Sequence, residues 1–129
     1  MHKIYTTYFA KLKKLNIENA AKALIMRMPP AAFFNEEDII HCPQLSPSSD
    51  ILIKYKKDGD FDSFTKSFKE MLENDEDMKK YINYIIEVIE SDEGNDVCLI
   101  CCEKDRNVCH RSILADYIKS ITSCEVIEL

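Results

Sequence analysis

The chain has 129 residues, of which 46% are hydrophobic and 31% charged, and its formal net charge is −6. This balance is typical of a globular protein, and the length predicts one domain, residues 1–129, with a sizeable core. The negative charge argues against non-specific binding of nucleic acid over the whole surface, but it leaves room for a local basic pocket.

The glycine and cysteine content excludes further classes of protein. With only two glycines, Gly59 and Gly94, neither a P-loop nor a dinucleotide-binding fingerprint can be built. No apolar run approaches the roughly 18 residues that span a bilayer, and Met1–Thr7 lacks the apolar core of a signal peptide. We therefore expect a cytoplasmic protein that does not associate with a membrane. Its six cysteines are expected to be reduced thiols rather than disulfides.

The first half of the chain predicts two strands and a long connection. Lys3–Tyr8 is rich in β-branched and aromatic residues, which favours a first strand followed by a short helical turn. Ala21–Arg27 predicts a second strand, mostly buried, that ends before Pro29. Residues 31–50 carry two further prolines and a Ser/Asp cluster, which is typical of a long irregular excursion.

Helices follow in the middle of the chain. Ile51–Tyr55 fits a short helix or a strand equally well. Asp60 is a suitable N-cap for a helix with an apolar face formed by Phe61, Phe64, Phe68, Met71 and Leu72. The most regular helix has either Asn74 or Asp75 near its N-cap and Gly94 beyond its end. Its apolar spacing comes from Met78, Tyr81, Ile82, Ile85, Ile86 and Ile89.

The last third predicts a buried strand over Val97–Lys104, a polar loop to Val108, a helix that starts on Cys109-His110-Arg111, and an edge strand over Glu125–Leu129. Strands that alternate with helices predict an α/β sandwich with a mainly parallel sheet. Ligands of such sheets lie outside the carboxyl ends of the strands. Those ends are Thr6 to Tyr8, Arg27 to Pro29 and Cys101 to Glu103.

Strand alternation separates the cysteines near the third of these ends. Cys101 and Glu103 are expected on one face, and Cys98 and Cys102 on the other, where they would be small core residues. The diverging thiols of Cys98 and Cys101 argue against a structural zinc site built on their spacing. The Cys-x5-Arg loop of cysteine phosphatases is absent, since Val108 and Asn107 occupy the positions of its arginine.

The Cys109-His110-Arg111 tripeptide has a chemical and a structural interpretation. A helix N-terminus attracts anions and can activate a cysteine, and Arg111, with Arg27 as a second donor, suits phosphate or carboxylate. Alternatively Cys109 caps the turn, His110 bonds a backbone carbonyl and Arg111 pairs with Glu103. His41-Cys42 could complete a metal site with Cys109 and His110, but an ordinary loop pair is favoured over that role.

Together, Cys101-Cys102-Glu103-Lys104 and Cys109-His110-Arg111 resemble the Cys-x-Glu and Cys-His-Arg signature of domain of unknown function 488. Tyr5–Leu12, Arg27 with Pro29-Pro30, and Leu45–Ser48 ahead of Tyr55-Lys56 match further segments of that family. The resemblance implies a small bacterial, archaeal or phage protein with a Rossmann-like three-layer sandwich. It implies no established reaction. Cys102, Ser46 and Ser112 depart from the usual pattern, outside the signature positions.

We therefore expect an enzyme that acts on an anionic, phosphate-bearing substrate, such as a nucleotide or a nucleic-acid end. The candidate catalytic residues are Cys101, Glu103, Cys109 and His110, and the candidate substrate-binding residues are Arg27, Arg111, Thr6 and Tyr8. The alternatives are a non-catalytic module that binds an anion or a partner in the same pocket, and a motif that only locks the last helix to the sheet. The sequence specifies no cofactor, no bound metal and no oligomeric state.

Overall fold

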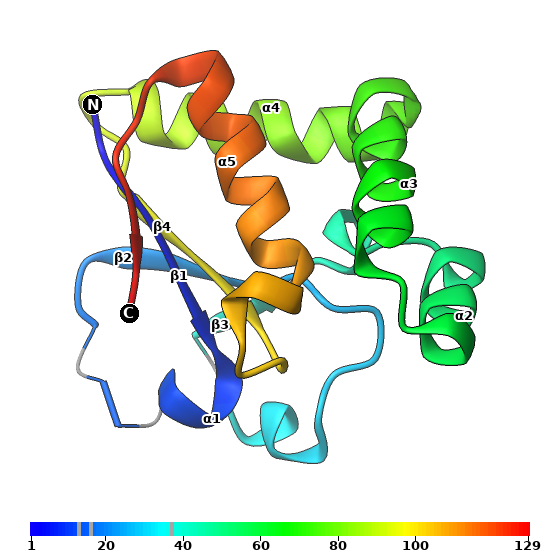
Figure 1. Ribbon diagram of the computed structural model, residues 1–129. Coiled ribbons are helices and arrows are strands. Elements are labelled where there is room, and N and C mark those ends of the chain that lie inside the picture. Colours follow the sequence, from blue (N-terminus) through cyan, green and yellow to red (C-terminus); the bar gives the residue numbers. More distant parts are fainter. Residues whose placement is uncertain (13, 16, 37) are drawn as a thin grey trace.

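A computed structural model describes residues 1–12, 14–15, 17–36 and 38–129. Within these residues, five strands form one sheet in the order β3-β2-β4-β1-β5, and all four neighbouring pairs are parallel (Figure 1). The strands are β1 (Ile4–Tyr8), β2 (Ala20–Leu24), β3 (Ile39–His41), β4 (Asp96–Cys101) and β5 (Val126–Glu128). The predicted parallel α/β sheet is confirmed.

The helices lie on both faces of this sheet, as the three-layer Rossmann-like architecture requires. Helices α2 (Ser49–Asp58), α3 (Phe61–Asn74), α4 (Glu76–Glu90) and α5 (His110–Thr122) contribute to the larger core, and α1 (Phe9–Leu12) belongs to the smaller one. Figure 1 shows α4 and α5 above the strands and α1 below them. No helix in the described part of the chain is long and apolar enough to cross a membrane.

Strand β4 is central and separates the two cores. Val97 and Leu99 point into the larger core, whereas Cys98 and Ile100 point into the smaller one. A strand buried on both faces reads as an unbroken apolar run, which explains the sequence of this segment. Its carboxyl end, Cys101, therefore lies between the sheet and the helical layer.

Carboxylate and hydroxyl caps mark where α2, α3 and α4 begin. The side chains of Ser48, Asp60 and Asp75 accept hydrogen bonds from backbone N–H groups in the first turns of α2, α3 and α4. The ambiguous segment at Ile51–Tyr55 is thus helical, within the longer α2. Asp75, rather than Asn74, caps α4.

Three expectations are corrected. Strand β2 ends at Leu24 rather than Arg27, and the 31–50 excursion holds β3, two short 3₁₀ turns and the start of α2. Three residues are too few for β3 to show a periodic pattern. Cys102 is exposed instead of lying in the core, because β4 ends at Cys101 rather than at Lys104 and the strand alternation ends with it.

Candidate active site

Two thiols and an imidazole converge at the carboxyl end of the central strand. Cys101 is the last residue of β4, Cys109 precedes α5, and His110 is the first residue of α5. The ligand atoms of the three side chains all lie within 4.8 Å of one another. Their exposed fractions are only 6%, 3% and 6%. We call these three residues the thiol–imidazole cluster.

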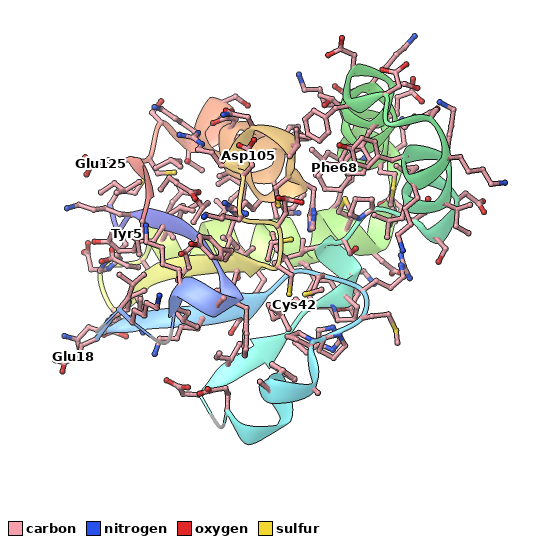
Figure 2. All side chains as sticks on the ribbon, turned by 60° about the horizontal axis from the view of Figure 1, so that its bottom comes forward. Tyr5, Glu18, Cys42, Phe68, Asp105 and Glu125 are labelled. Atoms are coloured by element: carbon pink, nitrogen blue, oxygen red, sulfur yellow. The ribbon has the colours of Figure 1, made fainter. Side chains whose placement is uncertain are left out.

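A backbone carbonyl orients the imidazole. His110 Nε2 lies 2.5 Å from the carbonyl oxygen of Ile25, just beyond β2. Because a carbonyl can only accept, Nε2 carries the proton, and in the neutral ring Nδ1 keeps its lone pair. Nδ1 faces Cys101 Sγ at 3.7 Å, and the ring stands edge-on to Phe68 with centroids 5.6 Å apart. Figure 2 shows Phe68 reaching from α3 into the space beside α5.

The two thiols differ in their proton affinity. A hydrogen bond from Cys109 lowers the pKa of Cys101 despite burial, and the backbone N–H groups of Cys102 and Glu103 act in the same direction. The same contact, together with burial, raises the pKa of Cys109 well above its ordinary value. Cys101 is therefore the sulfur that ionises more readily.

Arg111 has no exposed surface and is held by protein groups. Its Nε and Nη2 donate to the Glu128 carboxylate at 3.1 and 2.8 Å. Nη1 donates to the carbonyl oxygen of Glu103, and Nη2 also donates to that of Lys104 at 3.2 Å. The expected partner, the Glu103 carboxylate, is thus replaced by Glu128 on β5. Arg111 ties the loop between β4 and α5 to the edge of the sheet.

The other expected substrate-binding residues are engaged in or near the sheet. Thr6 is buried and its hydroxyl donates to Glu128 at 2.5 Å. Tyr8 is half-buried and lies beside Cys101 in the β1–β4 register. Arg27 is exposed, and its Nε and Nη2 donate to the carbonyl oxygen of Pro47 at 3.4 and 3.1 Å.

Glu103, the fourth expected catalytic residue, is exposed, and its carboxylate accepts from the backbone N–H of Asp105 at 3.1 Å. Asp105 lies on the loop in front of α5 (Figure 2). His41 Nε2 contacts the carbonyl oxygen of Met26 at 2.8 Å. The described side chains that cluster closely around Cys101 thus include neither Glu103 nor the His41-Cys42 pair.

A groove of about 490 Å³ leads to the cluster. It runs between α3 and α5 and reaches Cys109, and Arg106 and Asn107 line it at the loop. Its walls are formed by Phe61, Thr65, Lys69 and Glu73 of α3 and by Ser112, Ile113, Asp116, Tyr117 and Ser120 of α5. A polar and aromatic surface therefore lies beside the buried Cys109.

Three contributors to this site were missed by sequence reasoning. The Ile25 carbonyl is a backbone group and has no residue signal. Glu128 could have been suspected, since it is an acidic residue inside an expected strand. Arg106 is one of three arginines in the chain and precedes the Cys-His-Arg tripeptide. The sequence therefore places it near the site, but whether it lines a groove depends on how the helices pack.

Comparisons with known proteins identify the family. No curated protein and no solved structure matches the chain. One family model, described as "DUF488-N3a: Active DUF488-N3 subclade", matches residues 5–122. That span includes the thiol–imidazole cluster and the groove, and it extends over most of the chain. The chain therefore belongs to the DUF488 family, in its N3a subclade.

Proposed function

We propose that the protein is an enzyme that acts on an anionic, phosphate-bearing substrate, with the thiol–imidazole cluster as its reacting centre. The observation that carries this proposal is the convergence of Cys101, Cys109 and His110 next to a groove large enough for a small molecule. Reactive groups gathered beside a concave surface are the usual arrangement of an active site.

Cys101 and His110 have the geometry of a reacting pair. The Ile25 carbonyl fixes the imidazole so that its free lone pair faces Cys101 Sγ. A sulfur beside an oriented imidazole is the arrangement in which a thiol is activated or a metal ion is bound. Cys109 contributes the second sulfur at the end of the groove.

Arg106 and Lys69 are the cations that suit an anion in the groove. Both are exposed and line it, whereas Arg111 already donates to Glu128 and to two carbonyl groups. We therefore assign anion binding to Arg106 and Lys69, and we assign Arg111 to holding the loop. Guanidinium groups bind phosphate in a bidentate manner, which favours Arg106 as the main contact.

Ligand binding tests the groove. We expect inorganic phosphate, AMP, ATP or a 5′-phosphorylated oligonucleotide to raise the melting temperature, because ligands that bind the folded state stabilise it. Arg106→Gln should reduce the shift strongly. Lys119→Gln removes an exposed charge of α5 outside the groove and is the matched control. A melting-temperature shift in Arg106→Gln equal to that of the wild type would show that the anion binds outside this groove.

Turnover tests the reacting centre. The same four probes are incubated with the wild type and with Cys101→Ser, and products are followed by mass spectrometry. We expect the wild type to convert at least one probe and the variant to lose at least about a hundredfold in rate, since the sulfur would take part in the chemistry. Equal rates in the two proteins would contradict the proposed centre.

The second candidate is a non-catalytic binding module, which the near-complete burial of the two thiols favours. It predicts that the wild type binds a probe in the groove without converting it. Cys109→Ser would then leave affinity within about twofold, because a buried sulfur contributes little to ligand contacts. Arg106→Gln would abolish binding in both cases, so conversion of the probe decides between the two functions.

A further inference from the structure

We infer that Cys101, Cys109 and His110 bind a zinc ion through Sγ, Sγ and Nδ1, with a fourth coordination position left open. The inference deepens the proposed function by naming the chemistry of its centre, but zinc binding can be measured whether or not the groove binds an anion. It depends on the spacing of the three ligand atoms, on the orientation of the imidazole and on the charge balance of the buried site.

The spacing fits tetrahedral coordination. Zinc lies about 2.3 Å from thiolate sulfur and about 2.1 Å from imidazole nitrogen, which places a sulfur and a nitrogen ligand about 3.6 Å apart. Cys101 Sγ and His110 Nδ1 are 3.7 Å apart. Two sulfur ligands would be about 3.8 Å apart by the same geometry, and all three ligand atoms of the cluster lie within 4.8 Å of one another. An ion can therefore be bound with little movement of the side chains.

The imidazole is oriented as zinc-binding histidines are. Such a histidine donates its second ring N–H to a carbonyl or carboxylate, which fixes the tautomer and points the other nitrogen at the metal. His110 makes this contact from Nε2 to the Ile25 carbonyl at 2.5 Å. The edge-on contact with Phe68 restricts the ring further.

The charge balance of the buried site favours zinc. A buried charge is costly unless it is compensated, and two thiolates neutralise one divalent cation. The nearby Arg111 does not upset this balance, because it is paired with Glu128. Thiolate and imidazole ligands suit zinc and exclude magnesium and calcium, which require oxygen.

The fourth position distinguishes this site from a structural zinc site, which has four protein ligands. Cys102 follows Cys101, but its thiol is exposed and contacts Met26 Sδ at 3.1 Å. It is therefore directed to another partner. Cys109 lines the groove, so a molecule in the groove could supply the fourth ligand, and a bound zinc ion would lower the pKa of a coordinated water to about 7. Water or a substrate oxygen is the fourth ligand that we expect.

Metal analysis of the full chain tests the inference. We expect protein purified without chelators or metal-affinity resin to contain about one zinc ion per chain by inductively coupled plasma mass spectrometry. Replacement by Co²⁺ should produce thiolate-to-cobalt charge-transfer absorption and the visible bands of tetrahedral cobalt. A wild type that takes up neither ion stoichiometrically would overturn the inference.

Cysteine variants locate the ion. Cys101→Ser and Cys109→Ser should each weaken zinc binding by more than about tenfold, since each removes a ligand. Cys102→Ser is the matched control from the same loop and should bind zinc as the wild type does. Full zinc affinity in both ligand variants would exclude this site.

Alkylation of the wild type avoids any folding defect of the variants. Because Cys101 and Cys109 are buried even without zinc, the test compares rates: iodoacetamide followed by peptide mapping should modify Cys102 equally fast with or without zinc, and it should modify Cys101 and Cys109 more slowly when zinc is bound. Unprotected Cys101 and Cys109 in the zinc-loaded protein would overturn the inference. Zinc binding without any response to phosphate probes would reject the proposed function alone. Turnover by a wild type that takes up no zinc would reject the zinc site alone.

Discussion

Arg111 shows how a buried charge can be accommodated at a single residue. Its guanidinium has no exposed surface, and it donates to the Glu128 carboxylate and to the carbonyls of Glu103 and Lys104. Glu128 also accepts a hydrogen bond from Thr6. Burying two charges costs more than their attraction returns unless such additional hydrogen bonds are present. The network therefore makes Arg111 dependent on Glu128.

Removal of the Glu128 charge tests that dependence. We expect Glu128→Gln to lower the free energy of unfolding by about 3–5 kcal/mol, because it leaves a buried guanidinium without its counter-charge. Glu125→Gln is the control: Glu125 pairs with Lys3 at 3.5 Å, and its side chain is 60% exposed, so its loss should cost at most about 1 kcal/mol. Urea denaturation measures both variants, and equal losses would contradict the network.

The Arg111–Glu128 pair also predicts that the free energy of unfolding depends on pH. Burial alone would raise the pKa of Glu128, but hydrogen bonds from Arg111 and Thr6 outweigh it and lower the pKa. A carboxylate with a lowered pKa stabilises the folded state above its unfolded pKa, about 4.3, and this contribution is lost as the pH falls through the folded pKa. The stability difference between wild type and Glu128→Gln should therefore shrink below about pH 4.3. A difference that stays constant from pH 6 to pH 3 would contradict this assignment.

At the scale of elements, the turn between α4 and β4 depends on Gly94. A Cβ added at Gly94 would lie 1.7 Å from the Val88 carbonyl oxygen, which accepts from the backbone N–H of Asn95. The close approach requires glycine, because the clash is with backbone and not with a flexible side chain. The turn at Gly94 thus connects the end of α4 to the start of the central strand β4.

Two glycine substitutions separate this steric effect from backbone strain. Gly59 ends α2 with φ +64, and a Cβ there meets nothing within 4 Å, so Gly59→Ala should cost about 1–2 kcal/mol from left-handed strain alone. We expect Gly94→Ala to lower the free energy of unfolding by more than Gly59→Ala does, because the α4–β4 turn must move. Thermal denaturation ranks the two variants, and the reverse order would contradict the steric argument.

Asp75 serves two helices at once. Its backbone N–H donates to the Met71 carbonyl at the end of α3, and its carboxylate accepts from the backbone N–H of Met78 at 2.9 Å in α4. We expect Asp75→Ala to cost about 1 kcal/mol through the lost cap, and Asp75→Asn to recover most of it. Asp77→Ala, in the same first turn and exposed, should cost less. Equal effects at Asp75 and Asp77 would indicate that only helix-dipole charge matters.

For the whole molecule, the sheet unites residues that are far apart in the chain. Strand β1 pairs with both β4 and β5, and the backbone N–H of Leu129 donates to the Thr6 carbonyl. We expect removal of residues 126–129 to destabilise the protein more than Glu128→Gln does, because it removes strand pairing as well as the half-buried Glu128 carboxylate. Removal of Leu129 alone is the control, with one backbone hydrogen bond lost. Urea denaturation measures the two truncated chains and Glu128→Gln. Equal stability of all three variants would contradict this expectation.

The fold was predictable where periodic patterns are long. The apolar run of β4 and the helical spacing of α3 and α4 determine faces and boundaries locally, and the caps Asp60 and Asp75 mark the helix starts. Strand β3 is too short for any pattern, and the end of β2 depends on its neighbours. The exposure of Cys102 shows the limit of strand alternation, which holds only as far as the strand extends.

The three residues of the thiol–imidazole cluster were predictable from the sequence, but Arg106, Glu128 and the contacts of the site were not. The spacing of Cys101 and Cys109-His110 at a strand-to-helix connection indicated that these side chains would meet. The partner of Arg111 is set by the pairing of β5 with β1, and the partner of His110 is the backbone carbonyl of Ile25, just beyond β2. The groove beside Arg106 arises from the packing of two helices, so no local pattern could indicate it.

The parallel pairing of β1 with β5 has a practical consequence for labelling. Because the two strands run in the same direction at adjacent positions, the first and last residues lie at opposite ends of the sheet (Figure 1). A fluorophore or affinity tag on Met1 would project from the end opposite to Cys101 and Cys109. The same group attached after Leu129 would emerge at the end where β4 meets α5. Immobilisation through the amino terminus would thus present the groove to a ligand in solution.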